Sequence, residues 1–268
     1  IAGKHHTFES YLEDIFKSDI ADFITAIDFG NRSYTSRAAT DRLLALWQRY
    51  PKKHLVSLDL RYNYMSNLPE SIGYFTQLTR LNLSGNGLTE IPDSLVNLDK
   101  LTHLNLSFNN LTRMPDWIGS LGSIRELSLR QNQIDALPET ISQLSELIEL
   151  DLSVNRLTKL PASFGQLPKL EKLYLSSNLL SSLSESIALL GNLVKLDASY
   201  NNIRTVPESL AKLEQLAELH LSCNRISRIP ESLENNKTLK TLYLYGNDNM
   251  RISDTLRRRF KVGRNIPW

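Results

Sequence analysis

The residue pair best suited by type and spacing to covalent chemistry is His220 and Cys223, which lie three positions apart. A cysteine nucleophile requires a nearby base, and imidazole can serve as one. However, His220 is expected to face outward from a short strand, while Cys223 leads into the turn that follows it. We therefore interpret Cys223 as a small, half-buried thiol and predict no catalytic residues here.

Other chemical signatures are incomplete or absent in the sequence. Asp28-Phe29-Gly30 matches a tripeptide of protein kinases, but no glycine-rich loop or HRD motif precedes it. The sequence contains no GxxxxGK[ST], HExxH or GxSxG motif. One cysteine excludes an internal disulfide and a four-cysteine zinc site, and the five histidines are scattered. We predict that the chain is not an enzyme and holds no cofactor or metal.

The remaining candidates are aromatic and arginine side chains, which are preferred anchors of protein interfaces. They are Arg61, Tyr62, Arg80, Phe108, Arg130, Tyr174, Tyr200, His220, Tyr243 and Tyr245.

A repeat of 23 residues positions these candidates. With Leu55 as position 1, the same frame returns nine times without an insertion, the last copy being partial. Position 4 is always Leu, position 9 is always Asn, and position 15 is Pro in seven of the eight full copies. The LxxLxL segment predicts a short strand with its leucines in one core, and copies of it stack in parallel. The Asn at position 9 is expected to bond backbone groups of adjacent turns. The Pro suits the start of a short helical return segment.

This pattern, LxxLxLxxNxLxxLPxxIxxLxxL, resembles the 23-residue intracellular class of leucine-rich repeat proteins. The resemblance covers Leu55 to about Asn247. It implies an α/β solenoid with a curved parallel sheet on its concave side. The class includes Ras-suppressor and Erbin-like scaffolds and repeat domains of bacterial effectors. The secreted classes usually carry Cys-rich caps, which this sequence lacks.

The two ends depart from the repeat. Residues 1–54 predict a helical cap, with helices starting near Thr7, Ser18 and Ser36, or alternatively the tail of an upstream domain. Residues 55–248 form the nine repeats. Residues 249–268 predict a basic cap with a short helix over 253–260, and contain six Lys or Arg residues against one Asp. Because the chain starts at Ile1, we expect it to be a piece of a longer protein.

The outward positions 3, 5 and 7 define a concave face with two predicted clusters. The N-terminal cluster comprises Arg61, Tyr62, Tyr64, Arg80 and Phe108. The C-terminal cluster comprises Tyr174, Tyr200, His220, Tyr243 and Tyr245. An acidic spot of Glu126, Glu149 and Asp151 separates them, with Arg125 and Arg130 expected to offset its repulsion. Trp117 is a lesser candidate on the convex side, where we favour packing on its own turn.

These features predict a protein-recognition module that binds its partner on the concave face. The resemblance implies a signalling scaffold or the targeting domain of a bacterial effector. The alternative is the substrate-recognition part of a larger enzyme, such as a ubiquitin ligase.

Composition excludes a disordered chain, since 41% of residues are hydrophobic and the net charge is +2. The sequence has no apolar run of membrane-spanning length and no aromatic row among its C-terminal arginines. We therefore expect an intracellular monomer that neither spans a membrane nor binds nucleic acid.

Overall fold

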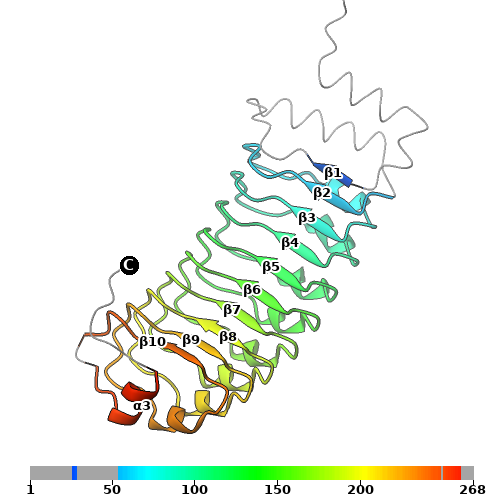
Figure 1. Cartoon of the computed structure of the whole chain (residues 1–268). Coiled ribbons are helices and arrows are strands. Elements are labelled where there is room, and N and C mark those ends of the chain that lie inside the picture. Colours follow the sequence, from blue (N-terminus) through cyan, green and yellow to red (C-terminus); the bar gives the residue numbers. More distant parts are fainter. Residues whose placement is uncertain (1–25, 29–53, 249, 261–268) are drawn as a thin grey trace, which may run out of the picture.

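A parallel sheet of ten consecutive strands runs the length of the molecule (Figure 1). The computed structural model describes residues 26–28, 54–248 and 250–260. Each strand has three residues, and each pairs with its neighbours in sequence order, so that β1 and β10 are the edges of the sheet. Nine of the strands begin at position 3 of a repeat. The strands are β1 Ala26–Asp28, β2 Ser57–Asp59, β3 Arg80–Asn82, β4 His103–Asn105, β5 Glu126–Ser128, β6 Glu149–Asp151, β7 Lys172–Tyr174, β8 Lys195–Asp197, β9 Glu218–His220 and β10 Thr241–Tyr243.

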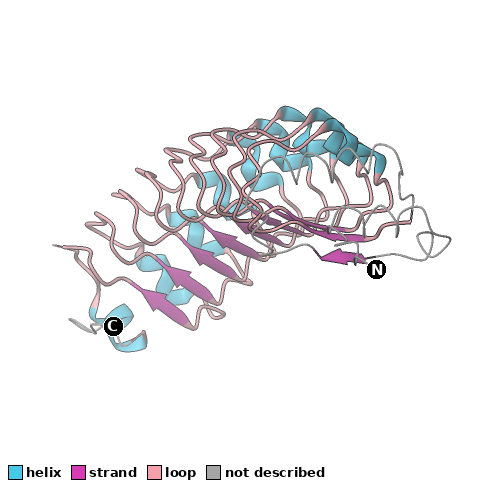
Figure 2. Ribbon diagram, turned by 90° about the horizontal axis from the view of Figure 1, so that it is seen from above, coloured by secondary structure: helices cyan, strands magenta, loops and turns pink. Residues whose placement is uncertain are grey.

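The return segments are short 3-10 helices that lie on the side opposite the sheet (Figure 2). The position-15 proline stands directly before each helix, and its carbonyl accepts a bond from the third helical residue, as from Ile72 to Pro69 at 3.1 Å. Ser184 replaces proline once, and its hydroxyl caps the helix by accepting from the Ser186 N–H. The helices are η2 Glu70–Tyr74, η3 Asp93–Asn97, η4 Asp116–Ser120, η5 Glu139–Gln143, η6 Ala162–Gln166, η7 Glu185–Leu189, η8 Glu208–Lys212 and η9 Glu231–Asn235.

One continuous hydrophobic core lies between the sheet and the return helices. The position-4 leucines, from Leu58 to Leu242, are at most 4% exposed. Each copy buries its apolar face against the next, so the solenoid is stabilised by contacts between neighbours. The predicted leucine-rich repeat architecture is confirmed.

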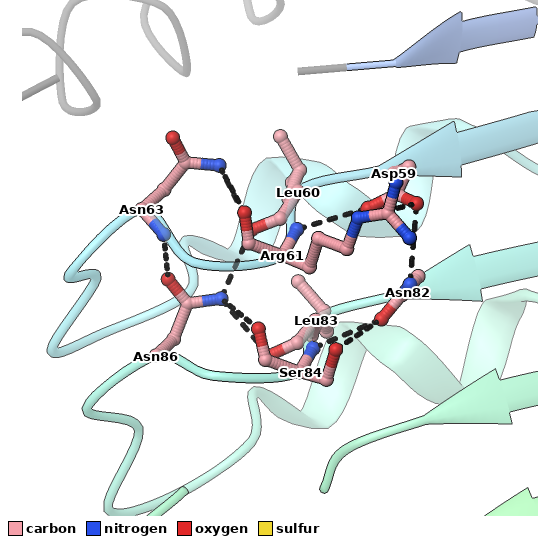
Figure 3. A network of polar contacts seen from close by, with 8 residues as sticks. All are labelled: Asp59, Leu60, Arg61, Asn63, Asn82, Leu83, Ser84 and Asn86. Carbon is pink, nitrogen blue, oxygen red and sulfur yellow. Dashed lines mark hydrogen bonds and ion pairs between the residues drawn. The ribbon is translucent and has the colours of Figure 1, made fainter. Parts of the chain in front are cut away.

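Asparagines at position 9 join successive turns through a ladder of hydrogen bonds. Figure 3 shows two of these asparagines, Asn63 and Asn86. The Asn86 amide nitrogen donates to the carbonyls of Leu60 and Leu83, at 3.0 and 2.9 Å. Its amide oxygen accepts from the backbone N–H groups of Asn63 and Met65. Each such amide thus satisfies backbone groups of two turns, as predicted, and a buried carbonyl without a partner would cost stability.

A left-handed backbone at position 8 turns the chain out of each repeat strand, from β2 to β10. All nine residues at this position have φ between 53° and 69°. Only two of them are glycines, Gly85 and Gly246, and one is the β-branched Val154. Because L-residues resist this conformation, the surrounding ladder must hold it in place.

The ends of the sheet differ from expectation in one respect. Strand β1 pairs in register with β2, although only helices were predicted for residues 1–54. The predicted N-terminal helices lie outside the described residues. At the other end, helix α3 (Asp254–Arg259) is capped by the Ser253 hydroxyl and buries Leu256.

Arg259 of α3 fastens this helix to the last return segment. Its guanidinium donates to the carbonyls of Leu233, Glu234, Asn236 and Leu239. One of the predicted basic residues therefore has a structural role.

Candidate partner-binding face

The parallel register aligns equivalent positions of successive repeats into rows that cross the strands. Position 3 gives a row from Ser57 to Thr241, and position 5 gives a row from Asp59 to Tyr243. These two rows form the concave face. The position-7 serines Ser84, Ser107, Ser153 and Ser199 are buried. The hydroxyls of Ser84, Ser107 and Ser199 donate to position-5 acceptors. Short position-7 side chains therefore add little to this surface.

The position-3 row is a ladder of paired charges. His103 Nε2 lies 3.5 Å from Glu126 Oε1, Lys172 Nζ lies 2.9 Å from Glu149 Oε2, and Lys195 Nζ lies 2.9 Å from Glu218 Oε2. Like charges meet on neighbouring strands between these pairs, as at Glu126 beside Glu149 and at Lys172 beside Lys195. Each of these four residues has its own partner on the strand at its other side, and Arg80 of the same row belongs to none of the pairs.

These pairs correct the sequence interpretation of the acidic spot. Its carboxylates are engaged by His103 and Lys172 rather than by Arg125 and Arg130. The hydrogen bond from Lys172 to Glu149 raises the pKa of the lysine. Arg125 instead acts on Glu146, where it assists Lys169 in lowering the carboxyl pKa.

The C-terminal cluster is a continuous chain of contacts from β7 to β10. The Lys195 ammonium lies 5.7 Å from the centre of the Tyr174 ring, in the range of a cation–π contact. Lys195 also pairs with Glu218, whose carboxylate lies 3.7 Å from His220 Nε2. The His220 and Tyr243 rings meet edge to face with centroids 4.4 Å apart.

Sequence reasoning missed Lys195 and Glu218 as the connecting residues. The available signal was the opposite charge at position 3 of adjacent repeats. Hydrogen bonding between them raises the pKa of Lys195 and lowers that of Glu218, which strengthens the pair. Burial raises the pKa of the Tyr174 phenol and lowers the pKa of the His220 imidazole, so both groups stay neutral at physiological pH.

Tyr243 and Tyr245 lie two residues apart in the sequence on the face of this cluster, and they are 51% and 46% exposed. Tyr243 lies in β10, and Tyr245 follows it at position 7. Tyr200 is also exposed but occupies the left-handed position 8, beyond the end of β8. It lies at the rim of the face rather than in the sheet.

The N-terminal cluster is less connected than the C-terminal one. The Tyr62 ring lies over Gly85 of the next turn, and Phe108 occupies the same rim one turn further on. Arg61 is held by Asp59, whose carboxylate accepts from the Arg61 N–H at 3.0 Å and lies 3.6 Å from Nε (Figure 3). Among the described residues, no ring contact or ion pair joins Arg80 to the rest of this cluster. Arg130 is half-buried at position 7 after β5.

A hollow of about 270 Å³ lies over strands β2 to β5 and was not predicted. Its polar lining consists of Ser57, Asp59, Arg80, Asn82, His103, Asn105, Glu126 and Ser128. All of these are at positions 3 and 5, so the hollow belongs to the concave face. The signal in the sequence was the short position-5 side chains of these repeats, in contrast to Tyr174, His220 and Tyr243.

Trp117 and Cys223, the other two candidates from the sequence, are both partly buried. Trp117 packs against the core, and its Nε1 donates to Asp93 Oδ1 of the preceding repeat at 2.8 Å. It therefore also contacts the preceding turn. Cys223 is half-buried at the left-handed position 8, next to Gly246.

Metal sites and membrane spans are both missing from the described part of the chain. Residues 26–28, 54–248 and 250–260 contain no group of three or more His, Cys, Asp or Glu side chains placed to hold a metal ion. These segments also include no helix with the length and apolar composition needed to cross a bilayer.

Family comparisons match the repeats. Residues 51–132 match the family described as a leucine-rich repeat region, and residues 123–180, 145–203 and 191–248 match the leucine rich repeat family. No curated protein matches the chain significantly.

Among solved structures, a leucine-rich repeat protein of Leptospira interrogans is 31% identical with a TM-score of 0.79, and the match covers 88% of this chain and 58% of that protein. The Arabidopsis receptor kinase HAESA, solved with the peptide hormone IDA and the co-receptor SERK1, is 29% identical with a TM-score of 0.64 and coverages of 73% and 34%. TLR13 in complex with ssRNA13 is 30% identical with a TM-score of 0.66 and coverages of 75% and 30%. This chain therefore spans little more than half of the first protein and about a third of the other two.

Proposed function

The chain belongs to the leucine-rich repeat family, and on that premise we propose that it recognises a partner protein through its concave face. The observation that carries this proposal is the connected C-terminal cluster, in which Tyr243 and Tyr245 are half exposed on a rigid sheet. Tyrosine buries a large area at a small cost in side-chain entropy, because only two χ angles must be fixed. The contacts of Tyr243 with His220 orient its ring before any partner arrives.

The partner's chemistry is protein rather than nucleic acid. A phosphate backbone is neutralised by closely spaced cations. The position-3 row instead contains both signs, with Glu126, Glu149 and Glu218 among its cations. Such a mixed row complements the side chains of a folded or extended polypeptide. The related HAESA structure, with its bound peptide hormone, is consistent with this type of ligand.

We further propose that the module works in an intracellular setting, as part of a signalling scaffold or as the targeting domain of a bacterial effector. The single cysteine, Cys223, is a free thiol and suits a reducing compartment. The rival role is substrate recognition within a larger enzyme such as a ubiquitin ligase. Sequence flanking this chain in its gene distinguishes these settings directly.

Site-specific photo-crosslinking tests the proposed face. A benzophenone side chain placed at Tyr243 should capture a protein partner from cells, with identification by mass spectrometry. The matched control is Tyr74 of η2, which is 59% exposed on the opposite side of the solenoid. Capture at Tyr74 but not at Tyr243 would place recognition on the convex side and overturn the proposal.

A further inference from the structure

The hollow over β2 to β5 exists because its position-5 side chains are short. Asn82, Asn105 and Ser128 occupy the row that carries Tyr174, His220 and Tyr243 further along the sheet. Arg80 lies at position 3 on β3, between Ser57 and His103 on the neighbouring strands, and is exposed. The hollow thus has a cationic wall and a floor of small polar groups.

The floor has hydrogen-bond donors that the protein itself does not use. Asn105 Oδ1 accepts from the Ser107 N–H at 3.0 Å and from the Ser107 hydroxyl at 2.6 Å, which fixes the orientation of the amide. Its Nδ2 atom has no partner among the described residues, and neither has the Ser128 hydroxyl. Asn82 differs, because its Nδ2 donates to Asp59 Oδ2 at 3.2 Å.

Arg80 adds a positive charge to the hollow in which these neutral donors lie. Within the described segments its guanidinium makes no ion pair or hydrogen bond, whereas Lys172 and Lys195 in the same row are both paired. Guanidinium presents its N–H groups in a planar fork that matches the two oxygens of a carboxylate.

The acidic groups of the hollow are occupied. Asp59 accepts from the Arg61 backbone N–H and from Asn82, and its carboxylate also faces the Arg61 guanidinium. Glu126 lies at the β5 end, with His103 Nε2 3.5 Å from its carboxylate. The unmatched groups are therefore donors. Arg80 and Asn105 lie on β3 and β4, one or two strands away from Glu126, whereas Ser128 shares β5 with it.

We propose that this hollow binds the side-chain carboxylate of an Asp or Glu in the partner segment, with Arg80 and Asn105 as its donors. This assignment rests on the proposed function of the concave face and specifies the chemistry that the partner must carry. A second carboxylate near Glu126 would be repelled, so the anion sits over β3 and β4. The distance from β4 to β10 is roughly 29 Å at about 4.8 Å per strand. A segment that also reaches Tyr243 therefore spans about nine extended residues.

A minimal probe tests the site before any partner is identified. N-acetyl-glutamic acid N-methylamide presents one carboxylate on a peptide unit, and the glutamine counterpart is its neutral match. Titration of the full chain, followed by amide NMR shifts, should give saturable changes at Arg80 and Asn105 with the acid only. Equal changes with both compounds, or no change at these residues, would overturn the proposal.

Two variants test the assigned donors. Arg80→Gln and Asn105→Asp should each weaken binding of the acid by roughly tenfold or more, because hydrogen bonds to a charged group are lost. Asn105→Asp keeps the fold, since Asp197 makes the same two bonds to Ser199 that Asn105 makes to Ser107. Arg228→Gln is the control, because it removes the same charge at a residue that lies outside the hollow. An unchanged dissociation constant in Arg80→Gln contradicts the proposal.

Failure of the carboxylate site and failure of the proposed function give different results in the two experiments. Loss of crosslinking at Tyr243 with a normal response to the acid would remove concave-face protein recognition but leave a carboxylate site. Crosslinking at Tyr243 without a response to the acid would overturn the site alone.

Discussion

The rings of His220 and Tyr243 meet edge to face on adjacent strands, with centroids 4.4 Å apart and planes at 73°. His220 Nε2 is buried and has no hydrogen-bond partner within the described part of the chain. Burial is the main reason that the pKa of His220 is lowered, although Asp197 and Glu218 act in the opposite direction. Protonation would place a charge inside the C-terminal cluster.

The lowered pKa of His220 predicts a loss of stability on mild acidification. Between the folded pKa and the ordinary value of 6.5, the unfolded chain binds more protons than the folded one. The free energy of unfolding therefore falls as pH decreases through 6.5 toward the folded pKa. Urea unfolding across this range should give a steeper decrease for the wild type than for His220→Gln. Parallel curves for the two proteins would show that His220 does not contribute to the pH dependence.

The asparagine ladder predicts a large effect of a small truncation. Asn155 Nδ2 donates to the carbonyls of Leu129 and Leu152, and its Oδ1 accepts from the Ile134 N–H. Asn155→Ala leaves these buried groups unpaired and should cost about 1–3 kcal/mol of unfolding free energy. Urea denaturation measures this cost, with Asn202→Ala, next to another ladder asparagine but only half-buried, as the control. A variant as stable as the parent would contradict the role assigned to the ladder.

Gly85 is predicted to be irreplaceable for two separate reasons. Its φ of 67° lies in the left-handed region, and an added Cβ would come 2.1 Å from Tyr62 Cδ1. Gly85→Ala should cost about 1–2 kcal/mol for the backbone alone and should also displace the Tyr62 ring. Thermal unfolding and tyrosine fluorescence report these two effects.

Gly122→Ala is the matched control for this substitution. No heavy atom lies within 4 Å of an added Cβ at Gly122, so its melting temperature should be unchanged or slightly raised. Equal losses in both variants would mean that the strain at Gly85 has been overstated.

The fold was predictable because its determinants repeat. A leucine at position 4 in every copy can be satisfied only by stacked strands in one register, so the partners of Leu150 on β5 and β7 followed from spacing alone. Strand β1 was missed because Ala26–Asp28 carries none of this spacing. The left-handed position 8 was missed because the two glycines that indicate it are outnumbered by residues such as Tyr62 and Val154.

The site was predictable only in part, since side-chain reach is not encoded by spacing. Register placed Tyr174, His220 and Tyr243 in one row, as expected. Which acid a given cation reaches depends on rotamers, and this is why Lys172 rather than Arg130 pairs with Glu149. The hollow likewise depends on side-chain directions. The sequence grouped Arg80 with Arg61, but Arg80 lines the hollow, whereas Arg61 pairs with Asp59 and is not in the lining.

Tyr243 and Tyr245 are predicted to contribute to binding far more than to stability. Both rings are about half exposed, so truncation removes little buried surface from the folded chain. In a complex the same rings would be covered, and aromatic anchors of this kind commonly account for about 2 kcal/mol or more. Tyr243→Ala combined with Tyr245→Ala should therefore weaken partner binding by at least about 2 kcal/mol in calorimetry, with hardly any change in melting temperature. Tyr74→Ala serves as the control, since its exposed ring lies on the opposite side. Unchanged affinity in the double variant, together with a loss in Trp117→Ala, would move the binding site to the convex side, because Trp117 belongs to helix η4.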